Sequence, residues 1–221
     1  MEQVNITFLG QSGFLLQKGS SSLIIDPGNK KAGERSGDVV FITHSHSDHT
    51  GGLETFLTHN PEATLVCNKQ VIDRFRKWQD RVVLAVSGEE IEEKSWKLRF
   101  LSAQHGLFRG EQNTGVIVQT SNLSFGHVGD AIEFQNFYEE KIDILAIPIV
   151  GMLATSPKKA LKELQQFSQP IPVVIPMHWL WRSPQKFCRH FKTIFPNSQC
   201  IVPKIGELVE WSSPSDKRVS F

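Results

Sequence analysis

Near the start of the chain, Val4, Ile6 and Phe8 alternate with polar residues, and this period of two is typical of half-buried β-strands. Glycine- and serine-rich turn clusters interrupt this alternation, and turns of this kind join neighbouring strands. The strand-like runs are 4–8, 14–16 and 23–25, and the turn clusters lie at 10–13 and 18–20. The pattern predicts that the chain begins with a β-meander.

After position 50 the apolar positions recur with the spacing of a helix. Leu53, Phe56 and Leu57 indicate a short amphipathic helix. Asn68 is placed to cap a second helix, whose apolar face is Val71, Ile72, Phe75 and Trp78. Strand-like runs return at 82–86, 98–101, 116–118 and 123–125.

Two later runs, 142–147 and 171–175, are almost wholly apolar, which predicts strands that are covered on both faces. Each run precedes a Ser-Pro helix start, at Ser156-Pro157 and at Ser183-Pro184. The inward residues that we expect are Ala160, Leu161, Leu164 and Phe167 in the first helix, and Phe187, Cys188, Phe191, Ile194 and Phe195 in the second. Strands interleaved with such helices predict an α/β class in which helices pack outside sheets.

The length of 221 residues suffices for one domain, 1–221, with a full core. The formal net charge of +1 gives no support for a nucleic-acid or membrane surface. The amino terminus has no export signal, and the most apolar stretch, 142–153, is too short to cross a bilayer, so we expect a cytoplasmic protein. Cys67, Cys188 and Cys200 form no C-x-x-C pair, and we expect buried thiols rather than disulfides or metal ligands.

Four potential metal ligands lie within six positions directly after the apolar run 39–42: His44, His46, Asp48 and His49. In an extended segment, residues two apart point the same way, so His44 and His46 can present their imidazoles to one ion. The chain then turns, and Asp48 and His49 can face a second position. The alternative is a polar loop in which Asp48 caps the next helix.

Three further residues each follow a strand-like segment: His105, Asp130 and His178. Their ordinary interpretations are a solvated loop histidine, a turn-forming aspartate and a core histidine. Because loops at strand ends can converge on one edge of a sheet sandwich, we expect these three side chains to complete the histidine cluster.

The pattern His44-x-His46-x-Asp48-His49, followed by His105, Asp130 and His178, resembles the metallo-β-lactamase superfamily of metal-dependent hydrolases. The segment 9–13 with Asp26-Pro27, and the segment 175–179, agree with it. The resemblance covers residues 6–205 and is nearest to the compact bacterial hydrolases that include ascorbate-6-phosphate lactonase. It implies a single-domain, four-layer αββα sandwich.

The resemblance implies that His44, His46 and His105 hold one divalent metal, that Asp48, His49 and His178 hold a second, and that Asp130 bridges both. Zn²⁺ is favoured for this nitrogen and oxygen donor set, and Mn²⁺ or Fe²⁺ would also fit.

The expected activity is hydrolysis of a small-molecule lactone, ester or phosphorylated metabolite by a metal-bound hydroxide, with Asp48 orienting the nucleophile and carrying a proton. A nucleic-acid phosphodiesterase and a non-hydrolytic metal-binding sensor or redox protein are the alternatives. No basic arm for RNA is evident, so we expect no nucleic-acid partner and no membrane partner.

The chain departs from the family pattern at two positions: Gln11 stands where relatives often carry histidine, and Ala131 replaces a hydroxyl residue after Asp130. Several other residues have two interpretations. Asp26 could form a turn or support the histidine loop, and we expect His127 to lie in the core or to support a ligand rather than to bind metal. Residues that could line a substrate pocket are Trp179, Trp181, Phe108 and Met152, and residues expected on solvated or structural positions are His59, His190, Arg74, Arg76 and Lys77.

Overall fold

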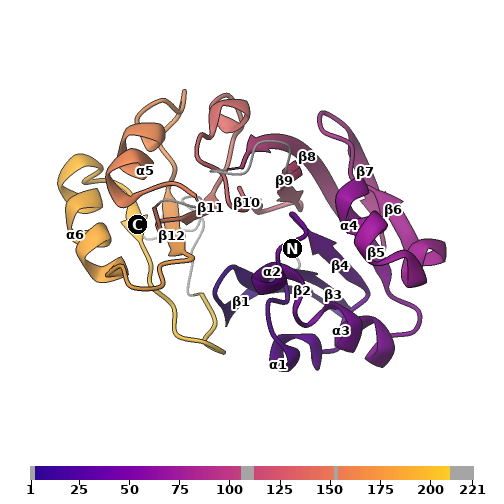
Figure 1. Ribbon diagram of the computed structural model, residues 1–221. Coiled ribbons are helices and arrows are strands. Elements are labelled where there is room, and N and C mark those ends of the chain that lie inside the picture. Colours follow the sequence, from indigo (N-terminus) through magenta and orange to yellow (C-terminus); the bar gives the residue numbers. More distant parts are fainter. Residues whose placement is uncertain (1–2, 106–111, 152–153, 210–221) are drawn as a thin grey trace.

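The computed structural model describes residues 3–105, 112–151 and 154–209, which form two stacked β-sheets with helices on their outer faces (Figure 1). Within these residues the first sheet has the spatial order β1-β2-β3-β4-β5-β6. Its strands are β1 Val4–Gly10, β2 Gly13–Lys18, β3 Ser21–Ile25, β4 Val39–Ile42, β5 Thr64–Cys67 and β6 Val82–Leu84. The first three are antiparallel, as the predicted meander requires, and β3 to β6 are parallel.

The second sheet follows the same plan, with an antiparallel part joined to a parallel part. Its order in the described chain is β13-β12-β11-β10-β9-β8-β7. The strands are β7 Glu90–Glu93, β8 Trp96–Gln104, β9 Gln112–Gln119, β10 Ser124–His127, β11 Ile144–Pro148, β12 Val173–Met177 and β13 Gln199–Cys200. The two apolar runs predicted as doubly covered strands are β11 and β12, and they pair in parallel between β10 and β13.

The helices are short and lie mainly on the outside of the sandwich (Figure 1). Their bounds are α1 Lys30–Gly33, α2 Ser47–Thr50, α3 Leu53–His59, α4 Lys69–Arg74, α5 Pro157–Leu164 and α6 Pro184–Ile194, with 3-10 turns η1 Arg76–Arg81 and η2 Gln135–Phe137. The predicted caps are confirmed, because the side chains of Asn68, Ser156 and Ser183 each accept a hydrogen bond from a backbone N–H in the first helical turn.

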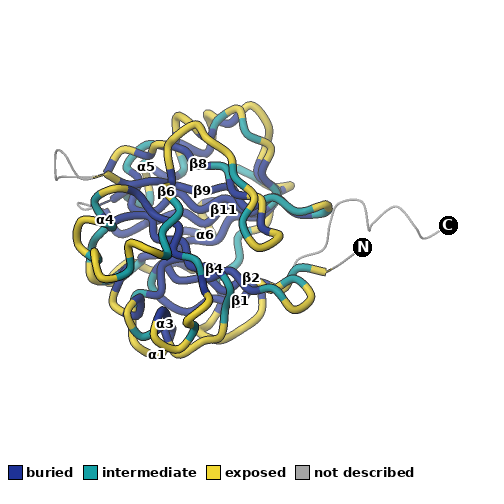
Figure 2. Tube along the Cα trace, turned by 90° about the vertical axis from the view of Figure 1, so that its right-hand side faces the viewer, coloured by how far each residue is buried: buried dark blue, intermediate teal, exposed yellow. Residues whose placement is uncertain are grey.

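Three apolar layers hold the four structural layers together, and the buried strands form the dark interior in Figure 2. The middle layer lies between the sheets, where the Phe14 ring is 5.3 Å from the rings of both Phe8 and Phe125. One outer layer packs α1, α3 and α4 on the first sheet, and the other packs α5 and α6 on the second. The predicted four-layer αββα arrangement is confirmed.

Some local predictions were wrong or incomplete. Ile194, predicted to face inward, is 40 % exposed at the end of α6. The helix after Asn68 ends at Arg74 and continues as the 3-10 turn η1. The charged strand β7 has no apolar alternation, and it forms because its backbone pairs with β8 at the sheet edge.

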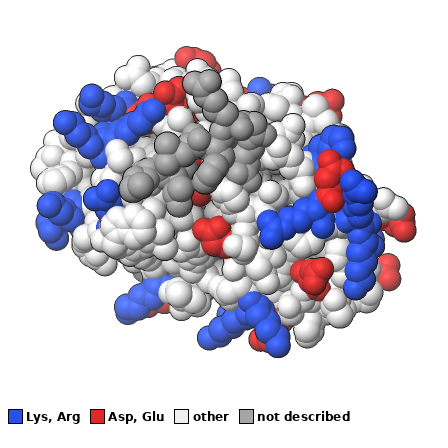
Figure 3. All heavy atoms as spheres, in the orientation of Figure 1, with Lys and Arg blue, Asp and Glu red and all other residues white. Residues whose placement is uncertain are grey.

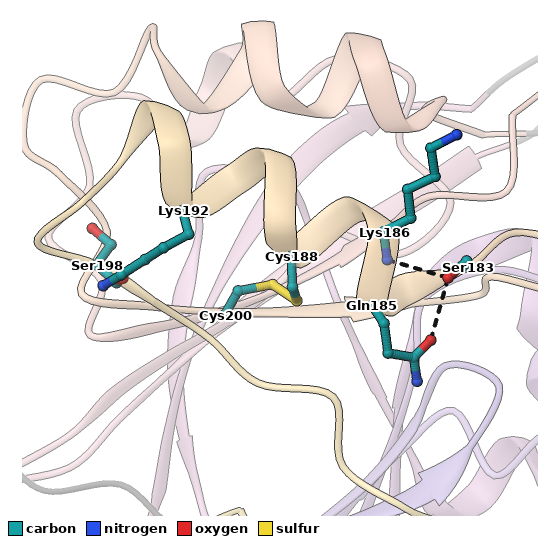
Figure 4. The surroundings of a disulfide bond; sticks show 7 residues. All are labelled: Ser183, Gln185, Lys186, Cys188, Lys192, Ser198 and Cys200. Carbon is teal, nitrogen blue, oxygen red and sulfur yellow. Dashed lines mark hydrogen bonds between the residues drawn. A yellow bond between two sulfur atoms is a disulfide. The ribbon is translucent and has the colours of Figure 1, made fainter.

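The prediction of three free thiols was wrong for two cysteines. Cys188 of α6 and Cys200 of β13 form a disulfide with Cα atoms 5.4 Å apart (Figure 4). They meet because the chain returns after α6 and adds β13 beside β12, against that helix. Cys67 is a buried free thiol, as predicted, and burial raises its pKa to about 12.

Among the described residues, no helix is both long enough and apolar enough to span a membrane.

We predict that Phe14→Ala lowers the free energy of unfolding by about 3–5 kcal/mol, because it opens a cavity in the layer shared by both sheets. Phe14 is fully buried, whereas Ile194 is 40 % exposed. The matched control Ile194→Ala should therefore cost less than about 1 kcal/mol. Urea unfolding followed by tryptophan fluorescence measures both values, and equal losses for the two variants would contradict the assigned core.

Candidate metal centre

The seven predicted ligands lie at the carboxyl ends of four strands. His44, His46, Asp48 and His49 follow β4, and the last two belong to the one-turn helix α2. His105 follows β8, Asp130 follows β10 and His178 follows β12. The structure brings all seven together in two adjoining groups. Rigid strands thus carry the side chains, while the loops set their orientation.

The first group consists of His44, His46, His105 and Asp130, whose ligand atoms all lie within 4.8 Å of one another. The Nε2 atom of His44 is 3.1 Å from the Nδ1 atom of His46. The ring of His105 is 4.9 Å from the rings of both. Three imidazoles and a carboxylate at this spacing form a donor set that suits Zn²⁺.

The second group consists of Asp48, His49 and His178, again with ligand atoms within 4.8 Å. The Nε2 atom of His178 is 2.9 Å from the Oδ2 atom of Asp48. His49 Nε2 is 4.0 Å from the same oxygen. One oxygen and two nitrogens could therefore hold a cation beside the first group.

Asp130 connects the two groups. Its carboxylate belongs to the first group, yet its Oδ1 atom is 3.5 Å from His49 Nε2 and its Oδ2 atom is 3.3 Å from His178 Nε2. The buried His49 Nε2 and Asp130 Oδ1 atoms have no hydrogen bond at normal distance. A cation between them would satisfy both atoms, so the residues present fit a two-metal centre.

Asp26 supports this centre from behind. Its Oδ1 atom accepts a hydrogen bond from the Thr43 N–H at 2.9 Å, and its Oδ2 atom accepts one from the Thr43 hydroxyl at 2.8 Å. The Nδ1 atom of His49 donates to Oδ2 at 2.7 Å, which leaves Nε2 free to face the ligand cluster. Of the two interpretations of Asp26, the structure therefore favours support of the histidine loop.

Asn113 is a supporting residue that the sequence did not reveal. Its side chain lies on β9, donates to the carbonyls of Ala103 and Val128, and accepts a hydrogen bond from the Asp130 N–H at 3.2 Å. Gly129 has φ +60°, and a Cβ atom there would lie 2.0 Å from Asn113 Oδ1. An asparagine inside a strand carries no local signal for this role, because its partners come from β8 and from the loop after β10.

The other candidate residues lie outside the set of seven ligands. His127 is fully buried, its Nε2 atom donates to the Ser12 carbonyl and its Nδ1 atom accepts from the Gly129 N–H, so it lies in the core as predicted. Trp179 packs on Phe8, and Trp181 is 66 % exposed. Phe108 and Met152 lie outside the described residues.

The other surface predictions agree with the structure in part. Arg74, Arg76 and Lys77 are exposed, and the Arg74 guanidinium also donates to the Ser45 carbonyl within the histidine loop. His59 is exposed on α3, where it bonds its own helix.

Burial and close charges shift the pKa values of several ligands. Burial, together with the neighbouring His49 and His105, holds the pKa of His44 well below its usual value, so this imidazole is neutral at pH 7. Burial alone would raise the pKa of Asp130, but the positive charge of His49 outweighs it and lowers that pKa. Burial would lower the pKa of His49, but Asp130 and Asp26 raise it. The carboxylates of Asp130 and Asp26 therefore favour a positive charge at His49, whereas burial and the neighbouring imidazoles disfavour one at His44.

The family model for the beta-lactamase superfamily domain matches residues 5–178. The chain belongs to this family. A relative from Korarchaeum cryptofilum (strain OPF8), named UPF0173 metal-dependent hydrolase, is 29 % identical over 94 % of this chain and 99 % of its own length.

Two solved structures show the same fold. The metallo hydrolase Igni18 from Ignicoccus hospitalis superposes with a TM-score of 0.81 at 20 % identity, covering 95 % of this chain and 99 % of its own. The metallo-beta-lactamase fold protein YhfI from Bacillus subtilis superposes with a TM-score of 0.77 at 15 % identity, covering 96 % and 100 %. The predicted metallo-β-lactamase fold is confirmed, and the resemblance to the ascorbate-6-phosphate lactonase subgroup stays a prediction.

We predict that Asp26→Asn weakens Zn²⁺ binding about 10- to 100-fold, because an amide can present its NH₂ group to His49 and disturb the tautomer that leaves Nε2 available. The matched control is Asp38→Asn, since Asp38 also accepts a backbone hydrogen bond, from Ser22, but does not contact the ligands. Competition titration against a fluorescent zinc chelator measures the affinity. Equal Zn²⁺ affinity in the Asp26 variant and the wild type would show that Asp26 only shapes its turn.

Proposed function

We propose that this protein is a metal-dependent hydrolase with a dinuclear centre that acts on a small-molecule lactone, ester or phosphorylated metabolite. The observation that carries this proposal is the position of the buried Asp130 carboxylate between two groups of ligand atoms. The similarity to a UPF0173 metal-dependent hydrolase supports it. The mixed nitrogen and oxygen donors favour Zn²⁺, and Mn²⁺ or Fe²⁺ also fit them. When bound, divalent cations held by these residues would lower the pKa of a bound water toward about 7 and would polarise an oxygen of the substrate.

Asp48 is the residue that we propose to orient the attacking water. Its side chain is 42 % exposed, in contrast to the buried side chains of Asp130 and His178, so a substrate can reach it. Burial raises its pKa, but the hydrogen bond from His178 and the charge of His49 outweigh this and hold the pKa well below its usual value. Asp48 is therefore a carboxylate at neutral pH, and it can orient the attacking water by accepting a hydrogen bond from it.

Gln11 is a positioning residue for Asp48. Its side-chain nitrogen donates to Asp48 Oδ2 at 3.2 Å, and its backbone carbonyl accepts a hydrogen bond from the His178 N–H at 2.9 Å. Its φ of 56° is a left-handed conformation that non-glycine residues rarely adopt, and such strain is often kept at functional sites. The first hairpin thus reaches the centre through Gln11, at the position where relatives often carry histidine, and through Ser12, whose hydroxyl oxygen is 3.1 Å from His49 Nδ1.

A nucleic-acid phosphodiesterase is the alternative substrate class. It would require a basic surface that follows the phosphate backbone, and the net charge of +1 gives no general support for one. RNA binding that weakens steeply with added salt would favour this alternative over a small-molecule hydrolase.

We predict that the purified protein loses hydrolysis of lactones, esters or phosphorylated metabolites after treatment with a chelator and regains it with added Zn²⁺ or Mn²⁺. Mass spectrometry under non-denaturing conditions should show two equivalents of metal per chain in the wild type. The Asp130→Asn variant should bind fewer than two equivalents. A substrate panel assayed before and after chelation is the measurement. Activity that is indifferent to both treatments, in protein shown to lack metal, would refute the proposal.

We predict that Gln11→Ala lowers kcat about 10- to 100-fold while the bound metal stays at two equivalents, because Asp48 loses its oriented hydrogen bond. The matched control is Gln17→Ala, since Gln17 is exposed on the neighbouring strand β2. Steady-state kinetics separates kcat from KM, and metal analysis shows whether the centre is intact. An unchanged kcat would remove Gln11 from the mechanism.

A further inference from the structure

A cavity of about 460 Å³ lies between helices α5 and α6, outside the set of seven ligands. Ligand sites for small molecules fall in the same range of volume. Its lining includes the apolar residues Leu161, Phe187 and Trp181 and the basic residues Lys158, Arg182 and Lys186. The remaining lining residues are Pro157, Ser183 and His190.

The apolar part of the cavity offers a surface on which an organic group can pack. Phe187 of α6 is 2 % exposed and belongs to the outer apolar layer, and the half-buried Leu161 of α5 packs against the same layer. Trp181, in the loop between β12 and α6, is 66 % exposed. Burying an exposed indole against a ligand is favourable, because the ring contributes a large apolar area.

The basic part has no compensating acid. No residue that lines the cavity is Asp or Glu, and in the part of the chain that the structure describes no ion pair joins Lys158, Arg182 or Lys186 to a carboxylate. By contrast, the neighbouring Lys159 pairs with Glu133 at 3.0 Å.

The two helices around the cavity reinforce this charge. Helix α6 has no acidic residue, and Glu163, the one acid of α5, is turned inward to Tyr138 and the Phe134 N–H. Figure 3 shows Lys and Arg side chains gathered over these helices. Lys158, Arg182 and Lys186 therefore give this cavity a positive charge that no ion pair among the described residues neutralises.

The first turns of both helices contribute to the same cavity. Pro157 and Lys158 open α5, while Ser183 and Lys186 lie at the start of α6. In Figure 4 the Lys186 side chain extends from α6 toward the side of α5. Helix amino termini carry partial positive charge, so they add to the attraction that the three basic side chains exert on an anion.

We propose that this cavity binds a small amphipathic anion, with a carboxylate, sulfonate or phosphate group between Lys158, Arg182 and Lys186. An apolar body about the size of one ring or a six-carbon chain packs on Leu161, Phe187 and Trp181. Both halves of the lining are needed, because the apolar wall supplies contact area and the cations select the charge.

The cavity and the candidate metal centre share their supporting loops. Arg182 lies four residues after His178, and its Nε atom donates to the Val150 carbonyl at 3.2 Å. Thr155, just before α5, donates through its hydroxyl to the carbonyl of Ala131, the residue after Asp130. The anion could therefore be the distal part of the substrate, which rests on the proposed function, or a separate effector.

The test uses 1-hexanesulfonate as the probe, with the full-length protein and tryptophan fluorescence as the readout. We expect saturable binding that changes the emission of Trp181, and at least about tenfold weaker binding of inorganic sulfate and of 1-hexanol, which each lack one half of the ligand. The Trp181→Phe variant should lose the signal, while calorimetry still detects the binding.

The double variant Lys158→Glu/Lys186→Glu should weaken hexanesulfonate binding at least about tenfold, because two attractions become repulsions. The matched control is Lys162→Glu, on α5 one turn beyond Lys158 and outside the lining. Both sets of substitutions are on exposed lysines, and thermal unfolding verifies the fold. Wild-type-like binding in the folded double variant, or no saturable binding to the wild type, would overturn the proposal.

A final arm separates the two sources of the anion. The binding of hexanesulfonate to metal-free protein is measured first. This measurement tests the cavity independently of whether the protein is a hydrolase. In active protein, hexanesulfonate that raises KM without changing kcat, and that loses this effect in the Lys158→Glu/Lys186→Glu variant, identifies the cavity as part of the substrate site. A change in kcat at saturating substrate identifies a separate effector site.

Discussion

A single buried carboxylate, that of Asp26, connects the fold to the candidate metal centre. It lies directly after β3, and its oxygens hold the Thr43 backbone, the Thr43 hydroxyl and His49. It accepts these hydrogen bonds without any exposure to solvent. The ends of β3 and β4 are thereby fixed to each other, and the histidine loop leaves the sheet in one orientation.

This arrangement concentrates polar groups that do not stabilise the fold by themselves. Several imidazoles and two carboxylates share a small volume at the edge of a sandwich whose interior is apolar. Burying them costs free energy unless each finds a partner. The apolar layers on both faces of each sheet offset that cost, and a pair of cations would satisfy the His49 Nε2 and Asp130 Oδ1 atoms, which have no hydrogen bond.

The loops that follow the parallel strands β11 and β12 contribute both to the candidate metal centre and to the cavity between α5 and α6. The loop after β12 carries His178. The same loop leads into α6 and the loop after β11 leads into α5, and the basic residues of the cavity lie in this region. A cavity with uncompensated positive charge thus lies on the same loops as a centre that attracts cations.

The sequence by itself determined the features that depend on neighbours along the chain. The alternation at 4–8, the Ser-Pro helix starts and the spacing of His44, His46, Asp48 and His49 are local, so they predicted strands, caps and a ligand cluster. Only the tertiary structure decided which distant residues meet. The Cys188–Cys200 pair, the support of Asp130 by Asn113, the edge strand β7 and the cavity between α5 and α6 all depend on it. These contacts arise when separate strands pair and helices pack, and no local pattern of residue types encodes that geometry.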